Sequence, residues 1–435
     1  MLLRFKITNF LSFYKETVFD MFPNIKRLNF QHHIYTDMEV PLLKQAAIYG
    51  ANGSGKSNFV KALIFLREFV TDKNFLKLID LDDYIFQLTN NKLQTISFEI
   101  EFLHKDKYYI YNVEINKKKI SEKLSISGLG KGEDKLIFER TDSHIHSSYL
   151  QNEESVKQLL SMNPQSSLLP LNLQFPVLSN NDVKKVYDWF SKQLQIITIN
   201  SQIPTLIGIM SLQPRLLRFA NEVFEQIGIG IDSIEIKESD FEKWSSNHKN
   251  ADFLRQIIEQ NPQQNNVGIT QLQNNRNVLN VHVQKGIRTV QEFAFDLLGQ
   301  SGYHKKMNIL SQSDGTVRLL TLIPAFFDAM FQNKTVIIDE IDNSIHPNLM
   351  FELIRFYANN KSNGQLIFTT HTTKLLNQHE LVRPDEIWLT EKVEGNTKMF
   401  SLNDFKLHNT LNIENGYLDG RYGAVPAIEE LSVEI

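Results

Sequence analysis

Residues 50–57 of the chain spell a glycine-rich loop of the form G-x-x-x-x-G-K-S. Its three glycines can adopt backbone conformations that a Cβ forbids, so that successive N–H groups can point into one anion-sized hollow. Lys56 adds a positive charge for the β- and γ-phosphates of a nucleotide, and the Ser57 hydroxyl can hold Mg²⁺. We therefore predict that a nucleoside triphosphate is bound by Asn52, Gly53, Ser54, Gly55, Lys56 and Ser57.

The sequence around this loop fits a strand–loop–helix unit. Residues 45–49 form an apolar run typical of a short buried strand, and apolar residues recur at helical spacing between Asn58 and Val70. In that order, the positive end of the helix dipole faces the phosphates. The context therefore supports a phosphate-binding loop over an incidental glycine turn.

Composition indicates a folded protein with more than one structural lobe. The chain has 435 residues, of which 42% are hydrophobic and 22% charged, and its net charge is −4. That charge argues against coating of nucleic acid by the whole surface but leaves room for a local basic groove. Because the sequence contains no cysteine, disulfides and thiolate metal sites are excluded. With no signal sequence and no apolar run of membrane-spanning length, we expect a cytoplasmic protein with no membrane contact.

The hydrophobic pattern divides the chain into three segments. Residues 1–140 read as an N-terminal lobe rich in antiparallel strands around the phosphate loop. Residues 141–290 read as a helical or mixed insertion, with a polar stretch near 244–280 that we expect to be mobile. In residues 291–435 apolar strands alternate with helices, which indicates a parallel sheet. The predicted fold class is α/β, with an antiparallel β lobe, a parallel-sheet core and an inserted helical subdomain.

The run at residues 336–340 supplies acidic groups that phosphoryl transfer needs. Its apolar residues predict a buried strand, and Asp339 emerges at the carboxyl end of that strand, where it can hold Mg²⁺. Glu340 can orient or deprotonate the attacking water. His371 directly follows the strand predicted at 364–370, where its imidazole could reach a γ-phosphate oxygen. The plainer interpretation of the acidic pair, a strand followed by a helix cap, is weaker because a phosphate loop lies upstream.

Three other polar segments of the sequence can be explained by local structure as well as by function. His346 precedes Pro347, which favours the start of a helix. Residues 313–316 read by themselves as a helix N-cap. A helix N-terminus also attracts anions, and here no phosphate loop precedes it in the same unit, as expected if the helix faces nucleotide bound to another copy of the chain. The acidic run at residues 80–83 reads as a solvated turn.

Five features in register resemble the bacterial AAA15 family, a group of ABC-type ATPases related to the OLD and RecF proteins. They lie at residues 5–10, 50–57, 313–316, 341–347 and 417–426. The third of these looks like a divergent version of the signature motif of ABC-type ATPases. The similarity covers both ends of the chain and is weakest in its middle.

The resemblance implies an ATPase head that binds ATP and Mg²⁺ and closes around them as a homodimer or a larger homo-oligomer. Within one chain the catalytic residues would be Lys56, Glu340 and His371, with Ser57 and Asp339 on the metal. A protein that only binds nucleotide does not need the Glu340 carboxylate, so hydrolysis is favoured over a slow, nucleotide-gated structural oligomer.

The same resemblance implies contributions from a second chain. Ser313 and Gly315 would approach the γ-phosphate from the partner, with Asp342 at the dimer seam. Such heads also use a glutamine to couple the metal to the lobe interface. Gln174 is the first candidate for this metal-linked residue and Gln87 the second, although either fits an ordinary polar residue.

Departures from the family pattern bear on function. Asp314 and Thr316 differ from the residues typical of transporter heads, which argues against a membrane transporter subunit. Some OLD-like relatives carry a C-terminal Toprim nuclease, but too few residues follow His371 for one. We therefore expect an ATPase sensor and scaffold for a separately encoded effector, a nuclease or toxin, in bacterial antiphage defence. The alternative is a DNA-repair or DNA-end-binding ATPase, with residues 117–119 and 304–306 as candidate DNA contacts, although such charge runs are usually solvated turns.

Overall fold

The structure is a computed structural model that describes residues 1–90, 92–147, 149, 153–199, 201, 206–247, 255–256, 266–267, 272–273, 276–277, 279–284, 287–377, 379–407 and 412–425. Two compact units can be distinguished. The first comprises Met1–Ile199, Asp328–Asp342 and Met350–Ile435, and the second comprises Asn200–Phe327 and Asn343–Leu349. Most of the polar stretch predicted near 244–280, and the last residue of the tail feature, lie outside the described residues.

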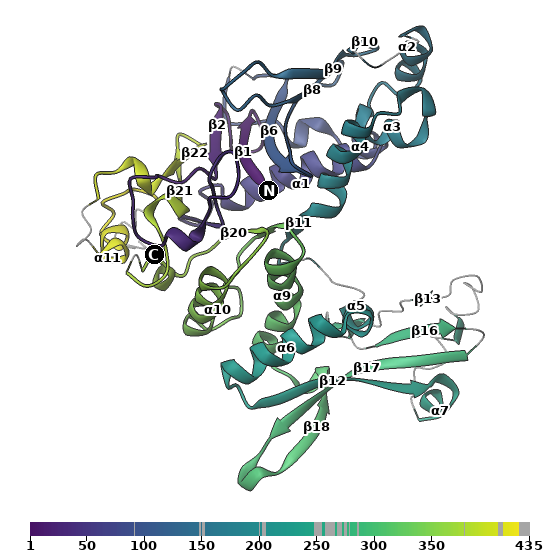
Figure 1. Ribbon diagram of the computed structural model, residues 1–435, viewed down its shortest axis with the longest axis vertical. Coiled ribbons are helices and arrows are strands. Elements are labelled where there is room, and N and C mark those ends of the chain that lie inside the picture. Colours follow the sequence, from purple (N-terminus) through teal and green to yellow (C-terminus); the bar gives the residue numbers. More distant parts are fainter. Residues whose placement is uncertain are drawn as a thin grey trace, which may run out of the picture. The chain divides into compact units, whose positions relative to one another are not determined.

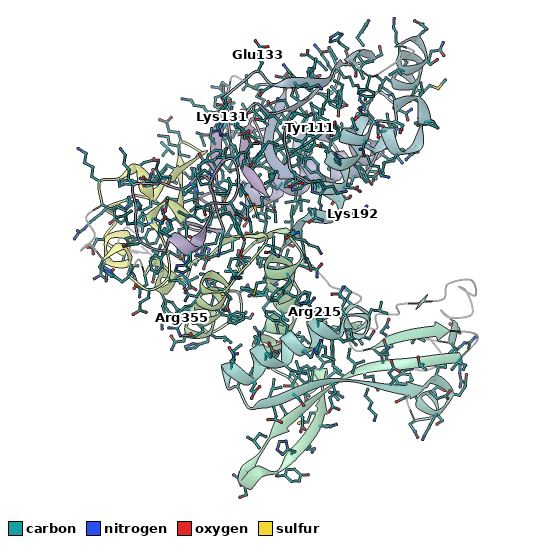
Figure 2. All side chains as sticks on the ribbon, viewed as in Figure 1. Tyr111, Lys131, Glu133, Lys192, Arg215 and Arg355 are labelled. Carbon is teal, nitrogen blue, oxygen red and sulfur yellow. The ribbon has the colours of Figure 1, made fainter. Side chains whose placement is uncertain are left out.

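A seven-stranded antiparallel sheet forms one lobe of the first unit, with the strand order β10-β9-β8-β7-β6-β1-β2. Alternating apolar residues in its strands bury one face, and Tyr111 lies inside this lobe, whereas Lys131 and Glu133 project from its surface (Figure 2). The strands are β1 (Leu2–Thr8), β2 (Thr17–Asp20), β6 (Ile96–His104), β7 (Lys107–Ile115), β8 (Ile120–Ile126), β9 (Lys135–Thr141) and β10 (His144–Ser147).

A six-stranded sheet in the same unit has the order β11-β19-β20-β5-β21-β22, and its first five strands are parallel. Every residue of β5, β19 and β20 is buried, as expected for apolar strands covered on both faces. The strands are β5 (Gln45–Gly50), β11 (Leu194–Ile197), β19 (Thr335–Ile338), β20 (Gln365–Thr369), β21 (Ile387–Val393) and β22 (Asn396–Ser401). Because parallel strands end at one edge, the segments that follow β5, β19 and β20 come together there.

Helix α1 (Lys56–Thr71) packs against both sheets of the first unit. The Phe59 ring lies 5.9 Å from that of Phe5 in β1 and 5.0 Å from that of Phe19 in β2. The same hydrophobic core contains Ile337 and Ile367 of the parallel sheet. This shared core fixes the start of α1, and hence the phosphate loop, relative to the strand ends.

Three further helices belong to the antiparallel lobe: α2 (Glu153–Met162), α3 (Leu168–Gln174) and α4 (Asn181–Asp188), followed by a π-helical turn at Trp189–Gln193. Trp189 stacks on Phe102 of β6, with ring centroids 4.1 Å apart. The buried Arg140 guanidinium donates to Glu122 Oε2 over 2.8 Å and to Ser166 O over 2.6 Å. These contacts place the segment in the first unit, so the second unit begins at Asn200 rather than at residue 141.

The first unit also contains the hairpin of β3 (Ile34–Tyr35) and β4 (Leu42–Leu43), most of α10 (Pro347–Asn359), and α11 (Ile413–Leu418). Tyr417 of α11 lies edge-on to Tyr49 of β5, with ring centroids 5.8 Å apart. The C-terminal feature noted in the sequence thus packs on the strand that leads into the phosphate loop.

The second unit combines helices with an antiparallel sheet of the order β12-β17-β16-β13, and β18 pairs with β17. Helix α6 packs along β12 (Figure 1). Its helices are α5 (Leu206–Leu212), α6 (Pro214–Ile227), α7 (Phe241–Ser245) and most of α9 (Asp314–Phe331). Its strands are β12 (Ile231–Asp240), β13 (Asn266–Val267), β14 (Leu272–Gln273), β15 (Arg276–Asn277), β16 (Asn280–Gln284), β17 (Ile287–Leu298) and β18 (His304–Asn308).

The predicted α/β fold class is confirmed, with its antiparallel lobe, parallel core and insertion. The inserted unit is mixed rather than purely helical. Strand β12 escaped the sequence prediction because it carries exposed polar residues on both faces and few apolar ones. None of the helices in the described part of the chain has both the length and the apolar character that a membrane span needs.

Candidate nucleotide-binding site

The phosphate loop connects β5 to α1 and depends on its glycines. Gly55 has a φ of 117°, and a Cβ at this position would lie 2.2 Å from Thr397 Oγ1. Gly50 is similarly constrained, because a Cβ there would lie 2.2 Å from Thr390 Oγ1. Both the backbone conformation and the close approach of a neighbouring hydroxyl therefore require glycine.

Hydroxyl groups from outside the motif brace this loop. Thr397 Oγ1 donates to Ser54 O over 2.7 Å and contacts Ser12 Oγ at 2.7 Å. Ser54 Oγ and Thr390 Oγ1 are hydrogen-bonded at 2.6 Å. The hairpin of β21 and β22 thus holds the loop from one side, while Asn52 and Gly53 at its tip remain exposed.

The Lys56 side chain is buried at the base of the loop. Its Nζ donates hydrogen bonds to Gly50 O over 2.8 Å and to Ala51 O over 3.1 Å. Burial lowers the pKa of Lys56 to about 8, although the carboxylates of Asp339, Glu340 and Asp342 oppose this shift. Phosphate oxygens bound near Nζ would favour the charged ammonium and so offset the effect of burial on the pKa of Lys56.

The structure brings the two acidic residues to the loop. Ser57 Oγ donates to Asp339 Oδ1 over 3.3 Å, although the two residues are 282 positions apart in the sequence. Two oxygens bound at right angles to one Mg²⁺ lie about 3 Å apart, so this pair suits the ion or its bound water. Asp339 Oδ1 also accepts a hydrogen bond from Thr369 Oγ1 over 2.6 Å. Glu340, the residue after Asp339, adopts a φ of 48°.

Asp342 contacts the segment that begins at His371, just beyond the carboxyl end of β20. Asp342 Oδ2 accepts from the His371 amide over 3.2 Å and from Thr372 Oγ1 over 2.7 Å. The His371 side chain is exposed, and partial desolvation of its ring followed by the positive charge of Lys56 lowers its pKa. The lowered pKa favours the neutral imidazole near the phosphate loop, which can donate to a γ-phosphate oxygen and accept from water.

The sequence profile of one family matches residues 46–377, and this family is described as "AAA domain, putative AbiEii toxin, Type IV TA system". The matched segment runs from the strand before the phosphate loop to the residues just after His371. The chain belongs to this AAA domain family. Membership in the family, together with the site geometry, makes the chain a nucleotide hydrolase of the phosphate-loop class.

Other comparisons are more distant. No curated protein matches the sequence. Solved structures with a similar fold include a SmcHead bound to the C-winged helix domain of ScpA, with 14% identity, a TM-score of 0.49, and coverage of 92% of this chain and 97% of that chain. The SMC head domain from Thermotoga maritima is 12% identical, with a TM-score of 0.41 and coverage of 93% of this chain and 99% of that chain.

The second unit of this AAA domain protein carries the Ser313–Gly315 motif. Ser313 Oγ accepts a hydrogen bond from the Thr316 amide over 3.2 Å and so caps α9. A Cβ at Gly315 would lie 2.8 Å from Ser344 O, so glycine allows the start of α9 to approach this turn. Ser313 itself is exposed. His346 is also exposed and accepts a hydrogen bond at Nδ1 from the Asn348 amide, at the start of α10.

The structure does not bring Gln174, the first candidate for the coupling glutamine, to the site. Gln174 Oε1 accepts from Lys73 Nζ over 2.8 Å. Lys73 follows the C-terminal end of α1, whereas Ser57 stands at its N-terminal end, and a 16-residue helix is about 24 Å long. Assignment of Gln174 to the metal site is therefore wrong for this structure. Gln87, the second candidate, donates from Nε2 to Asp82 O and accepts at Oε1 from Lys92 Nζ.

The candidate DNA-contacting lysines are partly neutralised by carboxylates. Lys117 forms ion pairs with Asp80 and Asp82, which lie in the acidic turn predicted from the sequence. Lys306 forms an ion pair with Glu235. These pairings favour the interpretation as solvated, structured turns over an open basic groove.

Four residues of the site belong to no recognised motif in the sequence: Ser12, Thr369, Thr390 and Thr397. Only Thr369 had a positional clue, because it lies between the predicted strand and His371. The others reach the phosphate loop only through tertiary contacts, from residues far along the chain.

Proposed function

We propose that the chain binds ATP with Mg²⁺ and hydrolyses it to ADP and phosphate. The observation that carries this proposal is the contact between Ser57 and Asp339, which joins the phosphate loop to the carboxyl end of β19. Around that contact, Lys56 would supply charge for the phosphates, Glu340 would activate water, and His371 would sense the γ-phosphate. Mg²⁺, when bound, supplies neutralisation of the developing phosphate charge.

We further propose that hydrolysis requires a homodimer, or a larger assembly, in which two chains enclose the nucleotide. Ser313 and Gly315 lie at the start of α9 in a unit that contains no phosphate loop. An exposed helix start with a serine hydroxyl is suited to the γ-phosphate of nucleotide on another chain. Asp342, whose carboxylate fixes the backbone of the His371 loop, would then transmit closure of the dimer to the site.

The biological role that we propose is that of an ATP-dependent sensor and scaffold for a separately encoded effector in antiphage defence. The family description names a toxin and a toxin–antitoxin system, which supports a working partnership with a second protein. The contact of Ser57 with Asp339, beside the buried Lys56, supports an ATP-driven step in such a partnership.

Co-expression tests this role. The chain is produced with the products of the genes adjacent to its own, purified with and without ATP, and its mass is measured under native conditions. We expect a stable complex with an adjacent gene product and a loss of phage protection in the Lys56→Ala variant. Absence of both a partner and an effect on phage infection contradicts the proposed role, while ATPase activity tests the enzymatic proposal independently.

A further inference from the structure

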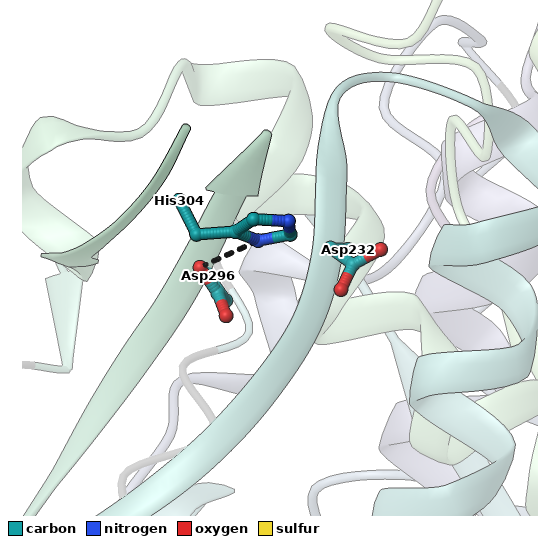
Figure 3. A group of neighbouring side chains, drawn as sticks. All are labelled: Asp232, Asp296 and His304. Atoms are coloured by element: carbon teal, nitrogen blue, oxygen red, sulfur yellow. Dashed lines mark ion pairs between the residues drawn. The ribbon is translucent and has the colours of Figure 1, made fainter. Parts of the chain in front are cut away.

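We propose that the second unit binds a divalent transition-metal ion between Asp232, Asp296 and His304. Each residue offers one ligand atom, and these atoms all lie within 4.8 Å of one another (Figure 3). The three residues come from neighbouring strands, β12, β17 and β18. A bound ion would therefore join three strands at one point.

The distance between His304 and Asp296 fits two ligands of one ion. His304 Nδ1 lies 3.3 Å from Asp296 Oδ1. Two atoms that are each about 2.1 Å from an ion, at an angle of about 90–110°, lie about 3.0–3.4 Å apart. The observed pair needs almost no rearrangement to accept the metal.

A second observation concerns the hydrogen bonding of the Asp296 carboxylate. Its Oδ1 atom is buried, yet among the described residues it has no hydrogen-bond partner, so its contact with His304 does not have hydrogen-bond geometry. Buried carboxylate oxygens normally have a hydrogen-bond partner, so one without a partner is a candidate ligand for a water or an ion. The contact of Asp296 Oδ1 with His304 Nδ1 is an ion-pair contact without hydrogen-bond geometry, so the carboxylate oxygen remains available to a metal ion.

The backbone places the third ligand beside these two. Ile231 pairs with Leu297 and Ser233 pairs with Asp296, so the strand register shifts at Asp232. An irregularity of this kind redirects a side chain relative to regular pleating. In Figure 3 the His304 ring lies between the Asp296 and Asp232 carboxylates, which is the arrangement of a three-ligand site.

The donor set selects the class of metal. One imidazole nitrogen with two carboxylates suits Zn²⁺, Mn²⁺, Fe²⁺ or Co²⁺, whereas Mg²⁺ and Ca²⁺ prefer sites made of oxygen alone. Three protein ligands leave coordination positions for water. Because the ion would bind the folded unit and not the unfolded chain, it should also stabilise the unit against unfolding.

Zinc binding to the full-length protein tests the proposal. Zn²⁺ is titrated without Mg²⁺ or nucleotide into the wild type, Asp296→Asn and His304→Gln, and the bound metal is counted by elemental analysis after gel filtration. The matched control is Glu235→Gln, which breaks the exposed ion pair with Lys306 on the same strands. We expect wild type and control to bind one Zn²⁺ more than the two variants, or to bind it at least tenfold more tightly. Equal stoichiometry and affinity in all four proteins, which would indicate adventitious zinc only, overturns the proposal.

A second measurement needs no variant. Crystals of the wild-type protein are soaked in Zn²⁺ at the concentration that saturates binding in solution, and anomalous differences are recorded at the zinc edge. We expect a peak within bonding distance of Asp232, Asp296 and His304. Zinc peaks elsewhere, with none at this cluster, overturn the proposal even where the variants fail to fold.

Discussion

Thr369 Oγ1 donates a hydrogen bond to Asp339 Oδ1 over 2.6 Å. The same hydroxyl accepts a hydrogen bond from the Glu340 amide over 2.7 Å. Glu340 has a φ of 48°, a conformation that residues with a side chain rarely adopt. Thr369 therefore orients the carboxylate that we propose for the metal and supports the strained backbone that carries the proposed base.

Removal of this hydroxyl should impair catalysis more than folding. We expect Thr369→Val to lower ATP turnover about 10- to 100-fold, because groups that orient a metal-linked carboxylate have effects of this size. Turnover is measured by phosphate release with Mg²⁺ and ATP. Thr335→Val is the matched control, since its hydroxyl bonds Gln365 at the opposite end of the same two strands. Equal turnover in Thr369→Val and wild type contradicts the role of Thr369.

Glu340→Gln separates nucleotide binding from hydrolysis. The amide keeps the shape of the side chain but cannot accept a proton from water, so we expect at least a 100-fold loss of turnover with ATP binding preserved. The variant should therefore remain in an ATP-bound state that native mass measurement can detect. Glu352→Gln, on the exposed surface of α10, is the control and should behave as wild type. If Glu340→Gln hydrolyses ATP at the wild-type rate, another group activates the water.

ATP affinity should fall at mildly alkaline pH. In the free protein Lys56 has a pKa of about 8 because it is buried. Bound phosphates favour the charged ammonium and raise that pKa, so between the two pKa values ATP binding takes up a proton. Affinity should then decrease as pH rises above about 8, with measurable proton uptake in calorimetry performed in two buffers. Lys56→Arg, which stays charged, should bind without this proton uptake. Proton uptake that is the same in both proteins rules Lys56 out as its source.

The buried ion pair of Arg140 and Glu122 should control the stability of the antiparallel lobe. Both side chains are fully buried, and Glu122 also accepts from Tyr111 and from the start of α3. Arg140→Met leaves Glu122 buried without its counter-charge, and we expect a loss of about 3–5 kcal/mol in the free energy of unfolding. Urea denaturation measures this loss.

The double variant provides the control for that experiment. Arg140→Met combined with Glu122→Gln removes both charges, so part of the lost stability should return. A double variant less stable than the sum of the two single variants shows that packing, not charge, dominates at this pair.

Local sequence patterns predicted the parts of the site that are contiguous in the chain. The phosphate loop, β19 with Asp339, and β20 before His371 have apolar runs and motifs that act at short range. The sequence also predicted the edge of the sheet at which these segments meet, because parallel strands end on the same side. The sequence could not predict which residues of other segments contact the loop. Thr397, for example, contacts Ser54 across 343 positions of the chain.

Two failures have a related physical cause. The resemblance implies a glutamine that couples two lobes, but no periodic pattern marks it in the sequence, and the fold directs the first candidate, Gln174, to Lys73. Residues 153–193 fall within the predicted insertion because apolar residues at helical spacing, as in 183–194, distinguish them from the N-terminal strands. Their apolar faces pack back on those strands through Trp189 and Phe102, which only tertiary structure reveals.

Mixing two inactive variants tests whether the site is shared between chains. Lys56→Ala removes the phosphate charge from its own loop, while Ser313→Arg places a bulky side chain at the exposed start of α9. In a mixed dimer, one of the two sites would combine an intact loop from one chain with an intact Ser313 from the other. We therefore expect each variant alone to be inactive and the mixture to recover up to about a quarter of wild-type turnover, since half of the dimers are mixed and each has one intact site. Ser311→Arg, beside the motif, is the control and should retain activity by itself. A mixture that stays inactive, although both variants fold and exchange subunits, contradicts a site shared between chains.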